Sequence, residues 1–219
     1  MPTPFQDRQD AGRQLAARLA GYAGDPNVLV LGLPRGGVPV AYEVARALGA
    51  PLDVFVVRKL GVPGHRELAM GAMASGGVRV LNMDVIEGLR IPREVVDSVA
   101  NEEWHEIERQ EKAYRGNLAA PQRKGRTIIV VDDGLATGST MRAAVRALRE
   151  SGPARIIVAV PVAAAETARK VRTEADSVVA INEPADFRAV SMWYQDFSQT
   201  TDEQVRGLLE DGAPVSRPT

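Results

Sequence analysis

Residues 128–140 read IIVVDDGLATGST, and this stretch decides the fold of the chain. It opens with four apolar residues, Ile128 to Val131, a run typical of a strand buried on both faces in a parallel sheet. Two adjacent carboxylates follow, and a loop of small residues and hydroxyls then leads into a helix-forming segment. This order predicts an open α/β sheet, in which ligands bind at the carboxyl ends of the strands.

The loop after the carboxylates has the composition of a phosphate-binding turn. Gly134 and Gly138 allow backbone conformations closed to other residues, so successive N–H groups can point inward. Thr137, Ser139 and Thr140 add hydroxyl donors, and the start of the next helix adds its partial positive charge. We therefore expect this segment to bind a phosphate group.

The adjacent carboxylates Asp132 and Asp133 need a separate explanation, because negative charge beside a phosphate is unfavourable. They fit if they accept hydrogen bonds from the hydroxyls of an attached sugar, stabilise positive charge developing on that sugar, or hold Mg²⁺ through water. A phosphorylated ribose satisfies all three explanations. Neighbouring strand residues point to opposite faces, which predicts different roles for the two carboxylates.

The composition is that of a globular chain without a dominant charge. The 219 residues carry 27 Lys and Arg against 28 Asp and Glu, so general nucleic-acid or membrane binding is not indicated. Cysteine is absent and only two histidines occur, which excludes a thiolate site and a multi-histidine metal centre. The polar start of the sequence and the lack of an apolar run of about 20 residues predict a cytoplasmic protein.

Apolar runs and helical periodicity extend the strand–helix pattern along the chain. Strands are predicted over 28–33, 52–57, 127–131, 156–160 and 178–181, and helices over 7–20, 40–48, 140–149 and 164–172. A glycine-rich stretch, 58–82, and a long charged helix, 92–114, interrupt the alternation and indicate an insertion or flap. That long helix reads as a solvated or dimer-contact helix and is assigned no chemistry.

A single domain is predicted over residues 1–219. Its parts are a core of about 26–183, an insertion of about 59–124 and a C-terminal hood of about 184–211, which the N-terminal helix can join. The final residues, 213–219, are predicted to be disordered.

Residues 128–140 resemble the thirteen-residue phosphoribosyl pyrophosphate (PRPP) motif of the type I phosphoribosyltransferases. An ordinary strand–turn–helix connection is the structural alternative, but it does not require an apolar tetrad, an acidic pair and GxxTGxT in one register. The resemblance covers about residues 26–183. It implies that Asp132 and Asp133 bind the ribose hydroxyls and that the loop from Ala136 to Thr140 binds the 5′-phosphate.

The loop from Leu33 to Gly37 follows the first core strand, where this family has its pyrophosphate loop. Arg35 is a rigid fork of donors suited to phosphate oxygens, and Gly36 and Gly37 let backbone N–H groups approach. The resemblance implies that these three residues bind pyrophosphate, that Arg35 assists catalysis, and that the Pro34–Arg35 peptide is cis. A Pro-Gly turn with a solvated arginine is the alternative.

Arg58 and Lys59 stand at the start of the insertion. In the family a mobile loop from this region closes over the pyrophosphate, so the resemblance implies that both residues bind pyrophosphate. A solvated strand end is the alternative.

The aromatic segment 187–197 falls where the family has a hood over the nucleobase. By resemblance, Phe187 or Trp193 stacks on the base and Asp196 assists Asp132 and Asp133 in holding Mg²⁺. Packing of the hood onto the domain is the other interpretation of the aromatic residues, and the sequence does not separate the two.

The resemblance implies a Mg²⁺-dependent enzyme that transfers the phosphoribosyl group of PRPP to a nitrogen nucleophile, with a nucleobase favoured, and releases pyrophosphate. It also implies a homodimer. Enzymes acting on 6-oxopurines have a lysine after the strand at 156–160, whereas residues 160–163 read VPVA, so the acceptor stays open. The alternative function is a regulatory protein that binds PRPP or a nucleotide without turnover; near-neutral charge disfavours a nucleic-acid partner.

Overall fold

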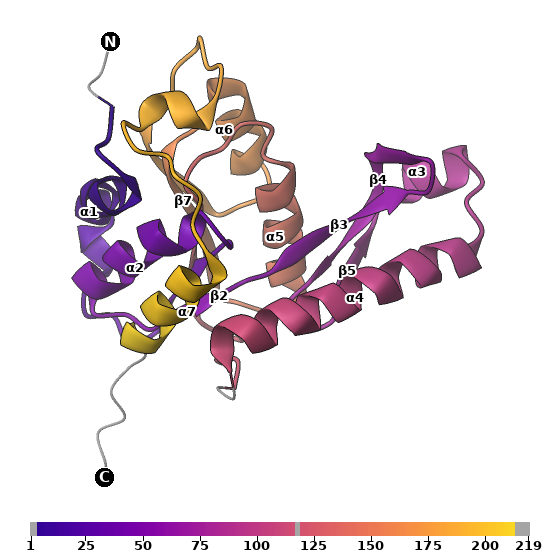
Figure 1. Cartoon of the computed structure of the whole chain (residues 1–219), viewed down its shortest axis with the longest axis horizontal. Coiled ribbons are helices and arrows are strands. Elements are labelled where there is room, and N and C mark those ends of the chain that lie inside the picture. The colour runs from indigo at the N-terminus through magenta and orange to yellow at the C-terminus, as the bar shows by residue number, and fades with distance from the viewer. Residues whose placement is uncertain (1–3, 117–118, 213–219) are drawn as a thin grey trace.

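The computed structural model describes residues 4–116 and 119–212. The molecule consists of a body built on a five-stranded sheet and a long arm that projects from it (Figure 1). The predicted disordered tail, 213–219, lies outside the described residues.

The body confirms the predicted open parallel sheet. Its strands run in the order β2-β1-β6-β7-β8, all pairs being parallel. The bounds are Val28–Gly32 for β1, Leu52–Val54 for β2, Thr127–Val131 for β6, Arg155–Val162 for β7 and Ser177–Asn182 for β8. Gly32 pairs with Val131, so the loops that follow β1 and β6 leave the sheet side by side.

Helices cover both faces of this sheet, because successive strand residues face opposite sides. Val28 and Val30 join a core on the side of α1 (Arg8–Arg18), α2 (Gly37–Leu48) and α7 (Asp202–Asp211). Leu29 and Leu31 join a second core on the side of α5 (Ser139–Glu150) and α6 (Ala165–Arg172). Among the residues that the structure describes, no helix has the length and apolar character needed to cross a membrane.

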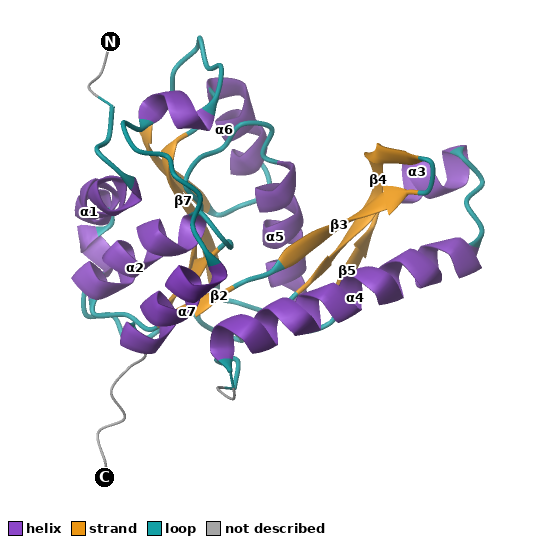
Figure 2. Cartoon of the chain, in the orientation of Figure 1, coloured by secondary structure: helices purple, strands orange, loops and turns teal. Residues whose placement is uncertain are grey.

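The arm is the insertion that interrupts the strand–helix alternation (Figure 2). It holds an antiparallel sheet and two helices, whose bounds are Val57–Val62 for β3, His65–Ala74 for β4, Val78–Leu81 for β5, Met83–Gly88 for α3 and Arg93–Arg115 for α4. The single strand predicted over 52–57 is wrong: β2 ends at Val54, and β3 begins a separate sheet at Val57. Phe55 and Val56 between them are buried, so the apolar run gives no sign of the break.

A buried ion pair fastens α4 to the body. Arg115, in the last turn of α4, donates to Asp53 of β2 at 2.7 Å and to the carbonyl of Val54 at 2.9 Å. It also donates to Glu111 one turn earlier at 2.8 Å. The end of the arm helix is therefore fixed at the edge strand of the parallel sheet.

The hood packs against the start of the chain. The N–H of Phe5 donates to the carbonyl of Trp193 at 2.9 Å, and the N–H of Gln195 donates to the carbonyl of Phe5 at 2.8 Å. Short 3-10 helices occur at Ala20–Tyr22 and Val190–Trp193. The C-terminal part of the hood forms α7, a helix that was not predicted although Thr201 and Gln204 form a capping box at its start.

Candidate active site

A pocket of about 470 Å³ opens beside the loops that follow β1 and β6. It is lined by Arg35, by Thr140 at the start of α5, by Arg58 at the base of the arm, and by Arg109 and Tyr114 of α4. The structure thus brings three residues predicted from separate motifs, Arg35, Arg58 and Thr140, to one cavity. The Pro34–Arg35 peptide is cis, as predicted.

The two acidic residues after β6 have different surroundings, as expected for different roles. Asp132 Oδ1 accepts a hydrogen bond from the N–H of Asp133 at 2.9 Å. Burial raises the pKa of Asp132 well above its usual range, and the neighbouring Asp133 carboxylate raises it further. Burial also raises the pKa of Asp133, but Arg8 opposes that shift.

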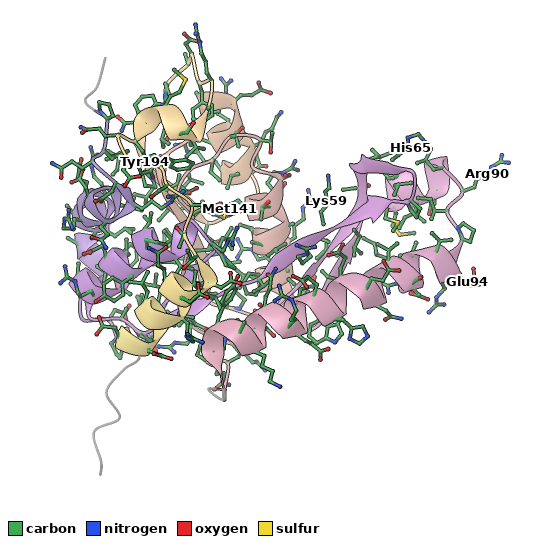
Figure 3. The ribbon with its side chains drawn as sticks, viewed as in Figure 1. Lys59, His65, Arg90, Glu94, Met141 and Tyr194 are labelled. Atoms are coloured by element: carbon green, nitrogen blue, oxygen red, sulfur yellow. The ribbon has the colours of Figure 1, made fainter. Side chains whose placement is uncertain are left out.

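Arg8 of α1 binds Asp133 with two of its nitrogens, although the residues lie 125 positions apart. Its Nε lies 2.9 Å and its Nη2 2.8 Å from Asp133 Oδ2. Its Nη1 donates to the carbonyl of Ser198 at 2.7 Å, and its guanidinium lies 4.0 Å from the ring centre of Phe197. Tyr194, labelled in Figure 3, donates its hydroxyl to the Asp133 carbonyl at 2.6 Å. The first helix and the hood together hold this acid.

The loop after β1 passes close to Asp133. A Cβ atom added at Gly36 would overlap Asp133 Oδ2, and one added at Gly37 would lie 2.7 Å from the carbonyl oxygen of Val131. Both glycines are therefore required by close approach of the two loops.

Replacing Gly36 by Ala is expected to push the Asp133 carboxylate away from Arg8. We expect a loss of roughly 1–3 kcal/mol in the free energy of unfolding, measured in urea, because overpacking forces neighbours to shift. Gly21→Ala is the matched control, since a Cβ atom there would meet nothing within 4 Å. Equal stability of the two variants would contradict the contact.

The predicted phosphate loop packs against α6 on one side and is exposed to solvent on the other. Gly138 has φ +70°, which favours glycine, and a Cβ atom there would overlap Thr167 of α6. Thr167 donates its hydroxyl to the carbonyl of Ala136 at 2.6 Å. Thr137 and Ser139, whose hydroxyls lie 3.3 Å apart, are exposed. The loop is thus fixed by α6 and presents its hydroxyls outward. A Cβ atom added at Gly134 would overlap the side chain of hood residue Val190.

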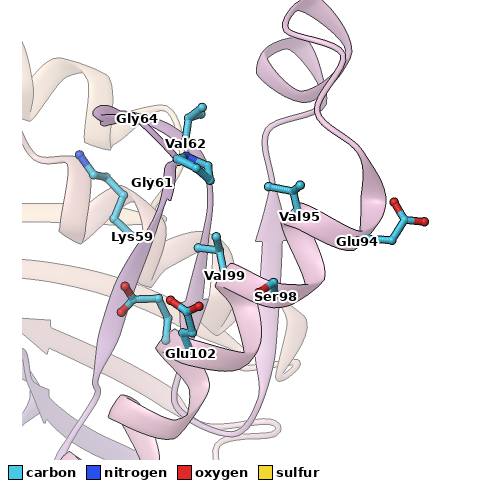
Figure 4. Close-up of a pocket in the computed structure, with 11 residues that line it drawn as sticks. Lys59, Gly61, Val62, Gly64, Glu94, Val95, Ser98, Val99 and Glu102 are labelled. Carbon is cyan, nitrogen blue, oxygen red and sulfur yellow. The ribbon is translucent and has the colours of Figure 1, made fainter.

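Lys59 lies on β3, where the arm faces the body (Figures 3 and 4). It lines a groove of about 370 Å³ together with Ser139, Thr140 and Arg142 of α5. A second groove, of about 670 Å³, separates the β3–β4 turn from α4 (Figure 4) and is lined by Lys59 and Glu102 among others. Lys59 therefore faces the predicted phosphate loop across a separate groove and does not line the pocket that Arg35 and Arg58 share, so its predicted role at the pyrophosphate stays a prediction.

The hood residues predicted to contact a base or a metal are spread out. Trp193 packs against the small core formed by Phe5, Ala11 and Tyr194, as in the interpretation that the aromatic residues pack the hood onto the domain. Phe187 is half-buried. Asp196 lines a separate groove between α1 and α7, and its Oδ1 accepts from the N–H of Ser198 at 2.8 Å. Hydrogen bonds from Ser198 lower the pKa of Asp196.

The arrangement of Asp132 and Asp133 suits a metal ion that binds together with a substrate. It suits less well a metal ion held by protein groups alone. Within residues 4–116 and 119–212, no group of three or more His, Cys, Asp or Glu is arranged to hold a metal ion. Mg²⁺ is commonly bound through one or two carboxylates together with substrate phosphates. Asp132 and Asp133 could supply that part of such a site.

The phosphoribosyl transferase domain family matches residues 67–196, which is more than half of the chain. The chain therefore belongs to this family, which confirms the resemblance seen in residues 128–140. The architecture agrees, because this fold is a parallel sheet flanked by helices.

Individual relatives agree with this assignment. The chain is 47% identical over 206 residues to the Mycobacterium tuberculosis (strain H37Rv) protein Rv0571c, provisionally named a phosphoribosyl transferase, covering 94% of this chain and 46% of the relative. It is 43% identical over 88 residues to the orotate phosphoribosyltransferase of Pelotomaculum thermopropionicum, covering 40% of this chain and 43% of that enzyme. The matched region thus covers less than half the length of each of these curated relatives.

Among solved structures, the crystal structure of the protein TT1426 from Thermus thermophilus superimposes with a TM-score of 0.86. The two chains are 42% identical, and the match covers 97% of this chain and 100% of TT1426. The similarity therefore includes the arm as well as the body.

Proposed function

We propose that the protein transfers the 5-phosphoribosyl group of PRPP to a nitrogen nucleophile of a nucleobase-like acceptor and releases pyrophosphate. The observation that carries this proposal is the pairing of β1 with β6, which sets the Arg35 loop beside the acidic pair and the phosphate loop. PRPP has three parts, a pyrophosphate, a ribose and a 5′-phosphate. Each of the three chain segments offers groups suited to one of those parts.

In this proposal the acidic pair works on the ribose. Asp132 and Asp133 accept hydrogen bonds from the ribose hydroxyls and stabilise the positive charge that develops on the sugar as the pyrophosphate leaves. Arg8 keeps the Asp133 carboxylate in place, so the acid does not have to reorganise during the reaction.

The 5′-phosphate and the pyrophosphate of PRPP are bound by different segments of the site. The loop residues Ala136, Thr137, Gly138, Ser139 and Thr140 bind the 5′-phosphate through N–H and hydroxyl groups, with Gly134 starting the turn. The pyrophosphate is bound by Arg35, by the backbone of Gly36 and Gly37, and by Arg58 and Lys59 of the arm. Their positive charge stabilises the leaving group.

Mg²⁺ belongs to the same proposal and rests on the family resemblance and on the acid pair. When bound, it would neutralise negative charge on the pyrophosphate. Asp132 and Asp133 would hold it through water or through the ribose hydroxyls, and Asp196 is a weaker candidate because it lines another groove. A homodimer and a cytoplasmic location rest on the resemblance and the composition alone.

The acceptor is not specified by the strand next to the phosphate loop. Val160, Val162 and Ala163 are fully buried, and Val162 accepts a hydrogen bond from the N–H of Leu135 through its carbonyl at 2.9 Å. This segment therefore supports the loop. We propose that the acceptor is recognised by hood groups, with Phe187 and Trp193 as the stacking candidates.

Calorimetric titration of PRPP, with and without Mg²⁺, tests the proposal. We expect binding that strengthens with Mg²⁺, followed by pyrophosphate release when a nitrogen acceptor is supplied. Absence of PRPP binding under both conditions would contradict the proposed activity. Mg²⁺-dependent PRPP binding without turnover across a broad set of nitrogen acceptors would favour the regulatory alternative.

Replacing Arg35 by Ala is expected to weaken PRPP binding about 10- to 100-fold and ribose 5-phosphate binding much less. The reason is that a charge-assisted hydrogen bond contributes roughly 1.5–3 kcal/mol, and only PRPP carries the pyrophosphate. Titration calorimetry with both ligands measures the difference. Arg46→Ala is the control, because Arg46 is an exposed arginine of α2 that pairs with Glu43. Equal weakening of both ligands would place Arg35 outside the pyrophosphate subsite.

A further inference from the structure

Helix α4, for which the sequence pattern indicated no chemical role, forms part of the pocket that Arg35 lines. Arg109, Gln110 and Tyr114 of α4 line the same cavity of about 470 Å³ as Arg35 and Thr140. The helix is held there by the buried pair between Arg115 and Asp53, at 2.7 Å. Its last turns are therefore a fixed wall of the pocket.

The three arginines that line this pocket, Arg35, Arg58 and Arg109, are all connected to α4. Glu103 of α4 accepts from Arg58 at 2.7 Å, and Glu106 accepts from Arg109 through both carboxylate oxygens at 2.8 Å. Arg35 is connected indirectly: Tyr114 of α4 donates to Asp202 at 3.1 Å, and the Asp202 carboxylate lies 3.7 Å from Arg35. The helix thus sets the positions of the cationic side chains in the cavity.

We propose that α4 is a wall of the pyrophosphate subsite and that Arg109 binds the pyrophosphate group of PRPP together with Arg35. This inference rests on the proposed function. The planar guanidinium of Arg109 matches phosphate oxygens in a two-bond geometry, and its side chain is 60% exposed, so a ligand can reach it.

The charges in the pocket suit an exchange of partners. Exposed ion pairs such as Arg109 with Glu106 contribute little to stability, so exchanging the carboxylate for a phosphate costs little. Arginine–phosphate pairs are stronger because both groups are charged and the contact is bidentate. The carboxylates therefore orient the arginines before a ligand binds, and the phosphate oxygens take their place.

The simpler interpretation is that Arg109 only supports the helix through its pair with Glu106, three residues earlier. Arg93 at the other end of α4 provides a matched comparison. It is 89% exposed, pairs with Asp97 on the same helix at 3.6 Å, and lies at the opposite end from the pocket. Arg93→Gln removes one intrahelical pair without touching the cavity.

The test is calorimetric titration of two probes, inorganic pyrophosphate with Mg²⁺ and ribose 5-phosphate, into the full chain and its variants. In Arg109→Gln we expect the Kd for pyrophosphate to rise about tenfold or more, with the Kd for ribose 5-phosphate within about twofold of wild type. In Arg93→Gln we expect both constants to stay unchanged. Arg109→Lys keeps the charge but loses the fork, and we expect an intermediate loss.

Unchanged pyrophosphate affinity in Arg109→Gln, or an equal loss for both probes, would overturn the inference while leaving the proposed function intact. Wild-type protein that binds neither PRPP nor pyrophosphate would overturn the proposed function and this inference with it. If circular dichroism shows that Arg109→Gln does not fold, Arg109→Lys is compared with wild type instead. Wild-type pyrophosphate affinity in Arg109→Lys would contradict a two-bond contact with Arg109.

Discussion

Replacing Asp133 by Asn is expected to lower the rate of pyrophosphate release from PRPP roughly 100-fold or more while the protein stays folded. The amide keeps the shape of the side chain and can still accept a hydrogen bond from Arg8. It loses the negative charge that, in the proposed mechanism, stabilises the developing positive charge on the ribose. The effect should therefore fall on turnover rather than on folding.

The measurement is the rate of pyrophosphate release with whichever acceptor supports wild-type turnover, together with a thermal melt. Asp97→Asn is the matched control, because it also breaks an ion pair between an aspartate and an arginine, Arg79, but on the arm. We expect the control to keep the wild-type rate. A wild-type rate in Asp133→Asn would refute the assigned role.

Replacing Asp132 by Asn is expected to stabilise the unliganded protein while it removes activity. Burial raises the pKa of Asp132 well above 3.8, so ionising it in the folded state is costly. The protonated Asp132 side chain contributes its full stability to the folded protein below the pKa of aspartate in the unfolded chain. That contribution is lost as the pH rises through the higher pKa of Asp132 in the folded protein. The neutral amide avoids this loss and can still accept the hydrogen bond from the N–H of Asp133.

Urea unfolding at pH 4.5 and pH 8 measures this effect. We expect the gain of Asp132→Asn over wild type to be larger at pH 8, by about 1.4 kcal/mol for each unit by which the folded-state pKa lies above pH 4.5. Asp176→Asn is a control of opposite sign, because hydrogen bonds from Arg149 lower the pKa of Asp176. That variant should be less stable than wild type at pH 8. A gain that does not grow with pH would contradict the buried charge.

The part of the site that is local in sequence could be predicted. The strand expected over 127–131 coincides with β6, and the helix expected over 140–149 lies within α5, because the apolar run and the loop glycines act within a few residues of each other. The cis peptide at Pro34–Arg35 followed from the family resemblance.

The contacts that complete the site could not be predicted, because they join distant segments. Nothing near Arg8 in the sequence marks it as the partner of Asp133. Arg109 lies in a charged helix whose pattern equally suits a solvated surface, and only the fold turns one side of it toward the pocket. The start of α7 did carry a local signal, the Thr201–Gln204 capping box, which the aromatic composition of the preceding segment obscured.

Asp133 is held by segments far apart in the sequence: Arg8 binds its carboxylate, Tyr194 donates to its backbone carbonyl, and the carbonyl of Ser198 accepts a hydrogen bond from Arg8. Because Tyr194 and Ser198 are synthesised after Arg8, the contacts that position Asp133 can be completed only late in the synthesis of the chain. The proposed site therefore reaches its final geometry only after the hood has formed.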